Sequence, residues 1–331
     1  MRAHNALKAH FISKKNGGNI GYPKKKRRHD PVNSYFFEKS GIRLDNSDSS
    51  FLWIPILKWI KLKEVGYITE DLIPYVTSGR IVREKDKYYV CLILQGDLPK
   101  KYILPKEKSP GRGIDLGTKS LCTIYPYKDD PFIPNPIYRK NYRNCERKIR
   151  RLQQVISHKE EVNMRKYGYE ERKDIKKKED VTKIYHTHNI RKLRKRINAL
   201  KSKQIRIMHD YIKKLCNQLV RTNPEYITIE DLDIEAMLQD ASPQLAYNIQ
   251  NSRFYYFREF LSWKCHEYDI ELRIANQWYA SSKTCSRCGH KRKKLKLEER
   301  VYKCKKCGLE IDRDINAAIN LYYTKDYTLA E

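Results

Sequence analysis

The chain has 331 residues, of which 69 are Lys or Arg and 40 are Asp or Glu, so its formal net charge is +29. This excess is far from the balance of an ordinary soluble enzyme. It favours a polyanionic partner, because a basic surface attracts nucleic acid and releases its counterions.

The composition also argues against two broad classes of protein. No apolar run reaches the roughly 18–20 residues of a membrane span, and the basic N-terminus lacks the apolar core of a signal peptide. Four of the nine cysteines have metal-binding spacing and the other five are scattered singly, which does not fit a disulfide scaffold. We therefore expect a soluble, cytoplasmic protein without a membrane partner.

The first 50 residues contain a basic run within GYPKKKRRHD, from Gly21 to Asp30. Its consecutive basic side chains are Lys24, Lys25, Lys26, Arg27 and Arg28. Such a run serves either nuclear import or contact with phosphates. In a chain that is basic throughout, a phosphate-contacting loop is favoured.

The region from residue 51 to 108 is predicted to be rich in β-structure. Apolar residues gather around Trp53 and Ile54, and YYVCLIL, from Tyr88 to Leu94, is a continuous β-branched and aromatic run. A small sheet or barrel fits this pattern. Residues 1–108 are therefore predicted to form a basic N-terminal segment followed by a β-rich, nucleic-acid-binding domain.

A second domain is predicted to begin at residue 109, after a polar linker that contains Pro110 and Gly111. GIDLGTKSLCTIYP follows as a predicted strand that carries Asp115, with Gly113 and Gly117 leaving space for backbone or ligand to approach. A single Asp at a strand edge is more often a turn former than a catalyst. The weight of Asp115 depends on the other acidic residues near it.

Two amphipathic helices are predicted between about residues 138 and 220. Apolar residues recur at helical spacing over residues 138–156 and 190–215, with Gln204 as a polar exception. We expect an antiparallel hairpin whose helices are joined by a mobile, charged linker over residues 157–183. Its outer faces are predominantly positive and favour contact with a nucleic-acid backbone. The candidate residues are Arg147, Lys148, Arg194 and Lys195.

The C-terminal third supplies two further acidic residues. YITIE is a predicted strand that ends at Glu230. A helix over 253–268 and a strand over 269–275 are predicted to follow. DRDINAA then begins a predicted helix that carries Asp314. This order fits an α/β domain with helices packed on a sheet. Magnesium prefers oxygen ligands, and phosphodiester hydrolysis uses two such ions about 4 Å apart. Asp115, Glu230 and Asp314 are therefore candidates for a nuclease site.

A separate metal site is predicted from two CxxC pairs that are fifteen residues apart. The four cysteines are Cys285, Cys288, Cys304 and Cys307. Each pair presents two thiolates to the same ion, which fits one tetrahedral zinc. Four thiolates leave no open position for water, so the role of this zinc is structural, or it helps to position nucleic acid.

Five motifs resemble those of the TnpB family in sequence and in order. They are GIDLGTK, ITIEDLDI, YASSKTCSRCG, YKCKKCG and DRDINAAINL. Members of this family are RuvC-type RNA-guided nucleases of insertion sequences, from which the miniature type V CRISPR effectors descend. The resemblance covers essentially the whole chain. It implies an RNase H-like (RuvC) nuclease domain over residues 109–283 with the helical hairpin inserted, a zinc ribbon over 284–308, and a last RuvC segment with a tail over 309–331.

The resemblance also implies ligands for the acidic residues and the cysteines. Two magnesium ions, with manganese as an alternative, are expected to be bound by Asp115, Glu230 and Asp314. The four cysteines are expected to bind one structural zinc. Neighbouring residues receive no role from the resemblance; they are Asp231, Asp312, Arg313 and Asn316.

The implied function is RNA-guided cleavage of DNA. The partners would be a guide RNA from the element's own flanking sequence and a target DNA in the nucleoid, which is recognised by RNA–DNA pairing. Whether a second copy of the chain takes part is not decided by the sequence. All three acidic residues are present, which favours an active endonuclease. The alternatives are an RNA-guided binding protein without cleavage (a repressor or inactive remnant), a compact type V CRISPR effector, and a transposase. A shortened N-terminal region, relative to the family, is the feature that supports loss of cleavage.

Overall fold

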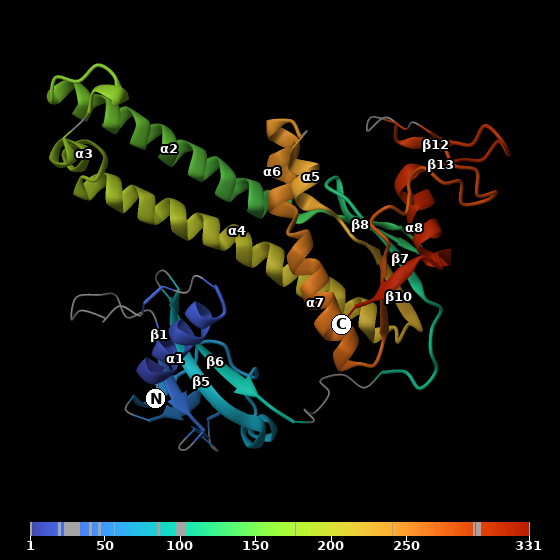
Figure 1. The fold of residues 1–331 in the computed structure, drawn as a ribbon, viewed down its shortest axis with the longest axis horizontal. Coiled ribbons are helices and arrows are strands. Elements are labelled where there is room, and N and C mark those ends of the chain that lie inside the picture. Colours follow the sequence, from blue (N-terminus) through green and yellow to red (C-terminus); the bar gives the residue numbers. More distant parts are fainter. Residues whose placement is uncertain are drawn as a thin grey trace. The chain divides into compact units, whose positions relative to one another are not determined.

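The structure is a computed structural model, in which the chain divides into two units, Met1–Pro99 and Lys100–Glu331 (Figure 1). The described residues are 2–18, 21–22, 34–39, 42–45, 48–55, 57–84, 87–96, 104–175, 177–239, 241–293, 295 and 299–330. The basic run from Lys24 to Arg28 lies outside them.

The N-terminal unit contains α1 (Arg2–Lys15), the 3₁₀ helix η1 (Glu70–Tyr75) and two small antiparallel sheets that share one core. One sheet has the order β1 (Ser34–Glu38), β5 (Val76–Glu84), β6 (Lys87–Leu94), and the other β2 (Arg43–Leu44), β3 (Phe51–Ile54), β4 (Lys58–Lys61). The β-rich character matches the sequence prediction. Helix α1 was not predicted, because its polar and apolar residues do not separate into two faces.

The second unit is built on a six-stranded mixed sheet with the order β14-β11-β10-β7-β8-β9. Its strands are β7 (Arg112–Leu116), β8 (Ser120–Tyr125), β9 (Phe132–Pro134), β10 (Tyr226–Glu230), β11 (Glu271–Ala275) and β14 (Tyr327–Leu329). The pairs β7–β8, β8–β9 and β11–β14 are antiparallel, whereas β7, β10 and β11 run parallel. The predicted single strand after Gly113 is wrong in one respect, because a polar turn at Gly117 folds it into the hairpin β7–β8.

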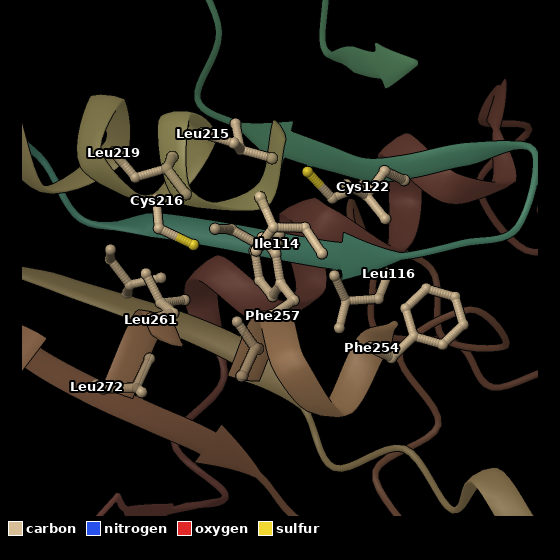
Figure 2. Close-up of a cluster of buried hydrophobic side chains, with 14 of the residues drawn as sticks. Ile114, Leu116, Cys122, Leu215, Cys216, Leu219, Phe254, Phe257, Leu261 and Leu272 are labelled. Carbon is tan, nitrogen blue, oxygen red and sulfur yellow. The ribbon is translucent and has the colours of Figure 1, made fainter. Parts of the chain in front are cut away.

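One face of this sheet is covered by α4 (His188–Arg221) and α7 (Phe254–Glu267). Figure 2 shows Ile114 and Leu116 of β7 packed among side chains of both helices, with Phe257 at the centre. Ile114 and Phe257 are fully buried. Alternate residues of a strand point to opposite faces, so Gly113 and Asp115 belong to the other face.

Two long helices, α2 (Lys140–Lys166) and α4, run side by side away from the sheet (Figure 1). Their seam buries Ile149, Ile156, Ile190 and Ile197, in agreement with the two predicted apolar stripes. The linker prediction is partly wrong, because α2 continues to Lys166 and the short helices η3 (Arg172–Asp174) and α3 (Lys178–Tyr185) follow. Long charged side chains are compatible with a helix, so charge alone did not mark its end.

The second unit also contains the 3₁₀ helix η2 (Pro136–Tyr138), three further helices and a small hairpin. They are α5 (Ile234–Gln239), α6 (Pro243–Ser252), the hairpin of β12 (Val301–Lys303) and β13 (Glu310–Asp312), and α8 (Arg313–Tyr323). Helix α8 packs on β7, β8 and β10. Within the described ranges, no helix has the length and apolar character needed to span a membrane.

Candidate metal centres

The pairing of β7 with β10 brings two of the candidate acidic residues together. The strands are parallel, and Ile229 lies opposite Ile114 in the ladder. The next residue along each strand is Glu230 on β10 and Asp115 on β7. Adjacent strands are about 4.8 Å apart, so this register places the two residues side by side at the same edge of the sheet.

Close packing of α8 on β7 brings the third acidic residue to the same place. A Cβ atom on Gly113 would lie 2.2 Å from the Ala318 carbonyl oxygen and 2.5 Å from the Tyr322 amide nitrogen. Glycine is therefore required for this approach of two backbones, as the sequence suggested. Asp115 lies two residues after Gly113 on the same face, and Asp314 lies in the first turn of α8.

The electrostatics indicate that Asp115, Glu230 and Asp314 form one carboxylate cluster. Burial is the main cause that raises the pKa of Asp115 well above its usual value, and the charges of Glu230 and Asp314 raise it further. Burial likewise raises the pKa of Glu230, while a hydrogen bond from the Ser281 hydroxyl acts in the opposite direction. Repulsion between like charges in a buried site is relieved either by protonation or by a bound cation.

Two arginines face the carboxylate cluster from the ribbon side. The Arg313 Nε lies 3.3 Å and the Arg300 Nη1 lies 3.8 Å from carboxylate oxygens of Asp314. Asp312 caps α8, because its side chain accepts hydrogen bonds from the backbone amides of Asp314 and Ile315. Asp314 is thus held by a helix cap and by two cations.

The carboxylate cluster offers the donor type that magnesium prefers, since all its ligand atoms are hard carboxylate oxygens. The surplus of buried negative charge around Asp115 also fits a divalent cation. Its ligand atoms are nevertheless more spread than those of the cysteines. Across the described part of the chain, the cysteines are the one group of three or more candidate ligands whose donor atoms all lie within 4.8 Å of one another.

The cysteine cluster consists of Cys285, Cys288, Cys304 and Cys307. The Sγ atoms of Cys285 and Cys307 are 3.5 Å apart, and those of Cys288 and Cys304 are 3.6 Å apart. Four sulfurs at about 2.3 Å from a tetrahedral zinc would be about 3.8 Å from one another. The observed spacing is too long for disulfides and suits a zinc ion.

Backbone amides favour the thiolate form at this cluster. Hydrogen bonding from the amides of Cys307 and then Lys306 lowers the pKa of Cys304 to about 6. The turn that follows each CxxC pair also has a glycine, Gly289 or Gly308, with a φ of +71° that other residues rarely adopt. The local sequence therefore supplies the turn geometry of both pairs and the lowered pKa of Cys304.

Two asparagines of α8 join the carboxylate and cysteine clusters. The Asn320 side chain donates to the Ser281 and Thr284 carbonyls, each at 2.7 Å. The Asn316 side chain donates to the Thr284 carbonyl and accepts from the Ser286 amide next to Cys285. Both asparagines are buried, so α8 fixes the first CxxC turn and also the segment whose Ser281 hydroxyl holds Glu230.

Comparisons with known proteins agree with this arrangement of motifs. Residues 105–241 match the family described as "Probable transposase", and residues 254–321 match the "Cas12f1-like, TNB domain". The mimivirus "TnpB-like protein L79" is 28% identical over 67% of this chain and 38% of its own length. By these matches the chain resembles the TnpB family.

Further relatives of this chain carry the provisional name of RNA-guided DNA endonuclease. A protein of Streptomyces pristinaespiralis is 35% identical over 40% of this chain and 32% of its own length. Another, from Mycobacterium tuberculosis, is 24% identical over 93% of this chain and 62% of its own length. The chain thus spans about a third of the length of the Streptomyces and mimivirus relatives. A solved structure of a "Cas12f1-sgRNA-target DNA complex" aligns over 95% of this chain and 75% of its own at 16% identity, with a TM-score of 0.43, which does not establish a shared fold.

Four of the predicted nucleic-acid-binding residues lie on the helical hairpin of α2 and α4. Arg147 and Lys148 of α2 and Lys195 of α4 are exposed. Arg194 differs, because its guanidinium is half-buried and lies 2.8 Å from a carboxylate oxygen of Glu160. The partner on α2 offsets its charge, so Arg194 joins the two helices and is a weaker candidate for phosphate contact.

Sequence reasoning missed three residues that border the carboxylate cluster: Ser281, Asn320 and Arg300. Ser281 and Asn320 occur within the recognised motifs YASSKTCSRCG and DRDINAAINL but are ordinary residue types for caps and turns. Arg300 lies among many basic residues. Only the folded arrangement distinguishes them from their neighbours.

Proposed function

We propose that this chain is a TnpB-type RNA-guided DNA endonuclease that hydrolyses phosphodiester bonds at the carboxylate cluster. The observation that supports this most strongly is the convergence of Asp115, Glu230 and Asp314 from distant parts of the sequence on one sheet edge. Structural needs alone do not favour this arrangement, because buried like charges destabilise a fold. A function that uses the charge explains it.

The chain's own residues would hold and orient the metal ions of such a site. Asp115 and Glu230 are fixed by the sheet register, and Asp314 by the cap of α8. When bound, two divalent ions, Mg²⁺ or Mn²⁺, would supply Lewis-acid stabilisation of the phosphodiester during hydrolysis. In this proposal, residues 109–283 and 309–331 form the RuvC-like domain, and residues 284–308 form a zinc ribbon.

The zinc ion is proposed to be structural. The four cysteines of the cluster would complete a tetrahedral coordination sphere, which leaves no position for a substrate. Asn316 and Asn320 would transmit the order of the ribbon to α8 and to Ser281. The ribbon would thereby keep Asp314 and Glu230 in place.

The proposed partners are a guide RNA encoded beside the gene and a DNA target that pairs with it. The net charge of +29 supports a polyanionic partner, and the exposed basic residues of α2 and α4 offer a surface for phosphates. The names of the relatives point in the same direction. Such a protein would act on DNA in the cytoplasm, as a monomer or together with a second copy.

The decisive experiment co-expresses the protein with the DNA that flanks its gene and sequences the RNA that co-purifies. The complex is then incubated with Mg²⁺ and guide-matched DNA that carries randomised flanks. Cleavage beside a defined flank is the expected result. Bound RNA without cleavage would instead favour an RNA-guided binding protein.

The assigned site is tested by Asp115→Ala, with Asp210→Ala as the matched control. Asp210 is an exposed residue of α4 that pairs with Lys214. We expect Asp115→Ala to abolish Mg²⁺-dependent cleavage while RNA binding stays nearly intact, and Asp210→Ala to cleave as the parent does. A cleaving Asp115→Ala protein would refute the site.

A further inference from the structure

Trp278 is an exposed aromatic residue beside the carboxylate cluster. Its side chain is 83% exposed, although large apolar side chains are usually buried at least in part. Across the described residues it has no aromatic or cationic ring partner. By contrast, the ring of Trp263 is 56% exposed and has the Lys264 ammonium 4.2 Å from its centroid and Phe260 against its edge.

The loop that carries Trp278 is attached next to Glu230 at both of its ends. It leaves the sheet at Ala275, which lies opposite Glu230 in the β10–β11 ladder. It returns at Ser281, whose hydroxyl donates to the Glu230 carboxylate. Three residues span at most about 11 Å, so the Trp278 backbone lies within about 11 Å of both attachment points. This bound is comparable to the length of one or two nucleotides, so the Trp278 backbone lies close to the strand that a phosphate bound at the carboxylate cluster would belong to.

Hydrogen bonds fix this loop without any contribution from the indole. The Asn276 side chain accepts from the Trp278 amide at 3.0 Å, and the Asn276 amide donates to the Asp326 carbonyl at 3.1 Å. The Tyr279 hydroxyl donates to the Asn320 carbonyl at 3.2 Å. The loop is thus ordered from both sides, and the exposed ring adds nothing visible to its stability.

We propose that Trp278 is a stacking platform for a nucleobase of the single DNA strand that enters the carboxylate cluster. The inference rests on the proposed nuclease function and adds a positioning residue for its substrate. Every base has a flat π-face, so stacking on an aromatic side chain holds a strand without reading its sequence. The occupant is a polyanion, in keeping with the charge of +29, and the ring would restrain it where the phosphates alone allow sliding.

Binding of a short single strand by the full-length protein tests the proposal without cleavage. The probes are an eight-residue oligothymidylate and an abasic oligomer with the same number of phosphates, without added Mg²⁺. Stacking contributes about 1–3 kcal/mol per base, so Trp278→Ala should weaken oligothymidylate binding by about 5- to 150-fold. Abasic binding should not change, and Trp278→Phe should restore most of the affinity. Tryptophan fluorescence should be quenched by oligothymidylate in the parent and much less in Trp278→Phe.

Trp263→Ala is the matched control, and it should bind both oligomers as the parent does. Equal affinities of Trp278→Ala and the parent for oligothymidylate would overturn the proposal. An equal loss of affinity for both oligomers would also overturn it, because the defect would then be structural. The same binding comparison in Asp115→Asn, which is not expected to cleave, tests the stacking platform separately from the nuclease function. Trp278-dependent stacking in a parent protein that never cleaves would contradict the nuclease proposal and leave the stacking platform in place.

Discussion

The cysteine cluster and the carboxylate cluster are two candidate metal centres that the chain assembles in different ways. The four cysteines lie within residues 285–307, and tight turns bring their sulfurs together. The acidic residues come from positions 115, 230 and 314, and they meet only because β7, β10 and α8 pack correctly. A local site depends on its own turns, whereas a long-range site depends on the whole domain.

The two centres are also not independent of each other. Asn316 and Asn320 attach the first CxxC turn to the helix that carries Asp314, and Asn320 holds the backbone at Ser281. We therefore expect damage to the cysteine cluster to reach the carboxylate cluster. Damage to the sheet packing should spare zinc binding, because the ribbon turns are local.

The largest effect is expected from removal of the zinc ligands. The double substitution Cys304→Ser and Cys307→Ser should reduce bound zinc from one ion per chain to none and lower the melting temperature. Structural zinc contributes on the order of 10 kcal/mol to small ribbons, so this ribbon should lose its fold. Cleavage should also be lost. Metal analysis and thermal unfolding measure the effect, with the exposed Cys91→Ser as control; an unchanged zinc content would show that the ribbon assignment is wrong.

Gly113→Ala should damage the carboxylate cluster and leave the cysteine cluster intact. The added methyl group would clash with the α8 backbone at Ala318 and Tyr322, and overpacking of this kind costs about 1–3 kcal/mol. Cleavage should fall steeply because α8 and Asp314 move away from β7, while zinc content stays at one ion. Gly21→Ala is the control, since nothing lies within 4 Å of its added Cβ. Normal cleavage by Gly113→Ala would contradict the close approach of α8.

Asn320→Ala tests the connection between the centres. It leaves the buried Ser281 carbonyl without its side-chain donor, at an expected cost of about 1–3 kcal/mol in unfolding free energy. Zinc should be retained, and cleavage should fall because Ser281 no longer holds Glu230 firmly. A urea titration and a cleavage assay measure both quantities. Asn248→Ala, on the more exposed helix α6, should change neither by a measurable amount.

The smallest expected effect is a gain of stability in Asp115→Asn. Burial and neighbouring charges raise the pKa of Asp115 in the folded state, so the metal-free parent loses stability as the pH rises from the unfolded-state value near 4 towards that raised pKa. Asparagine has no such loss. Asp115→Asn should therefore be more stable than the parent at pH 8, and close to it in stability at pH 4. Thermal unfolding at both pH values, without divalent ions, decides this; a parent that gains stability relative to the variant as pH rises would contradict it.

Local patterns predicted many elements correctly, and the errors have identifiable causes. YITIE is the strand β10, and the predicted helix over 253–268 is α7 to within one residue at each end. The hairpin β7–β8 was predicted as one strand because apolar residues continue on both sides of Gly117. Helices α5 and α6 were not predicted, since short helices carry few turns of periodic signal.

The sequence by itself determined the identity of the candidate ligands, the spacing of the cysteines and the basic character of the chain. These properties follow from residue types and from distances of a few positions, which backbone turns convert directly into geometry. The tertiary structure decided which acidic residues meet, through the register of β7 and β10 and the contact of α8 with Gly113. It also decided that Ser281 holds Glu230, that Asn316 and Asn320 connect the two centres, and that the Trp278 ring stays in solvent. Contacts between residues far apart in the chain depend on packing, and packing is a property of the folded domain as a whole.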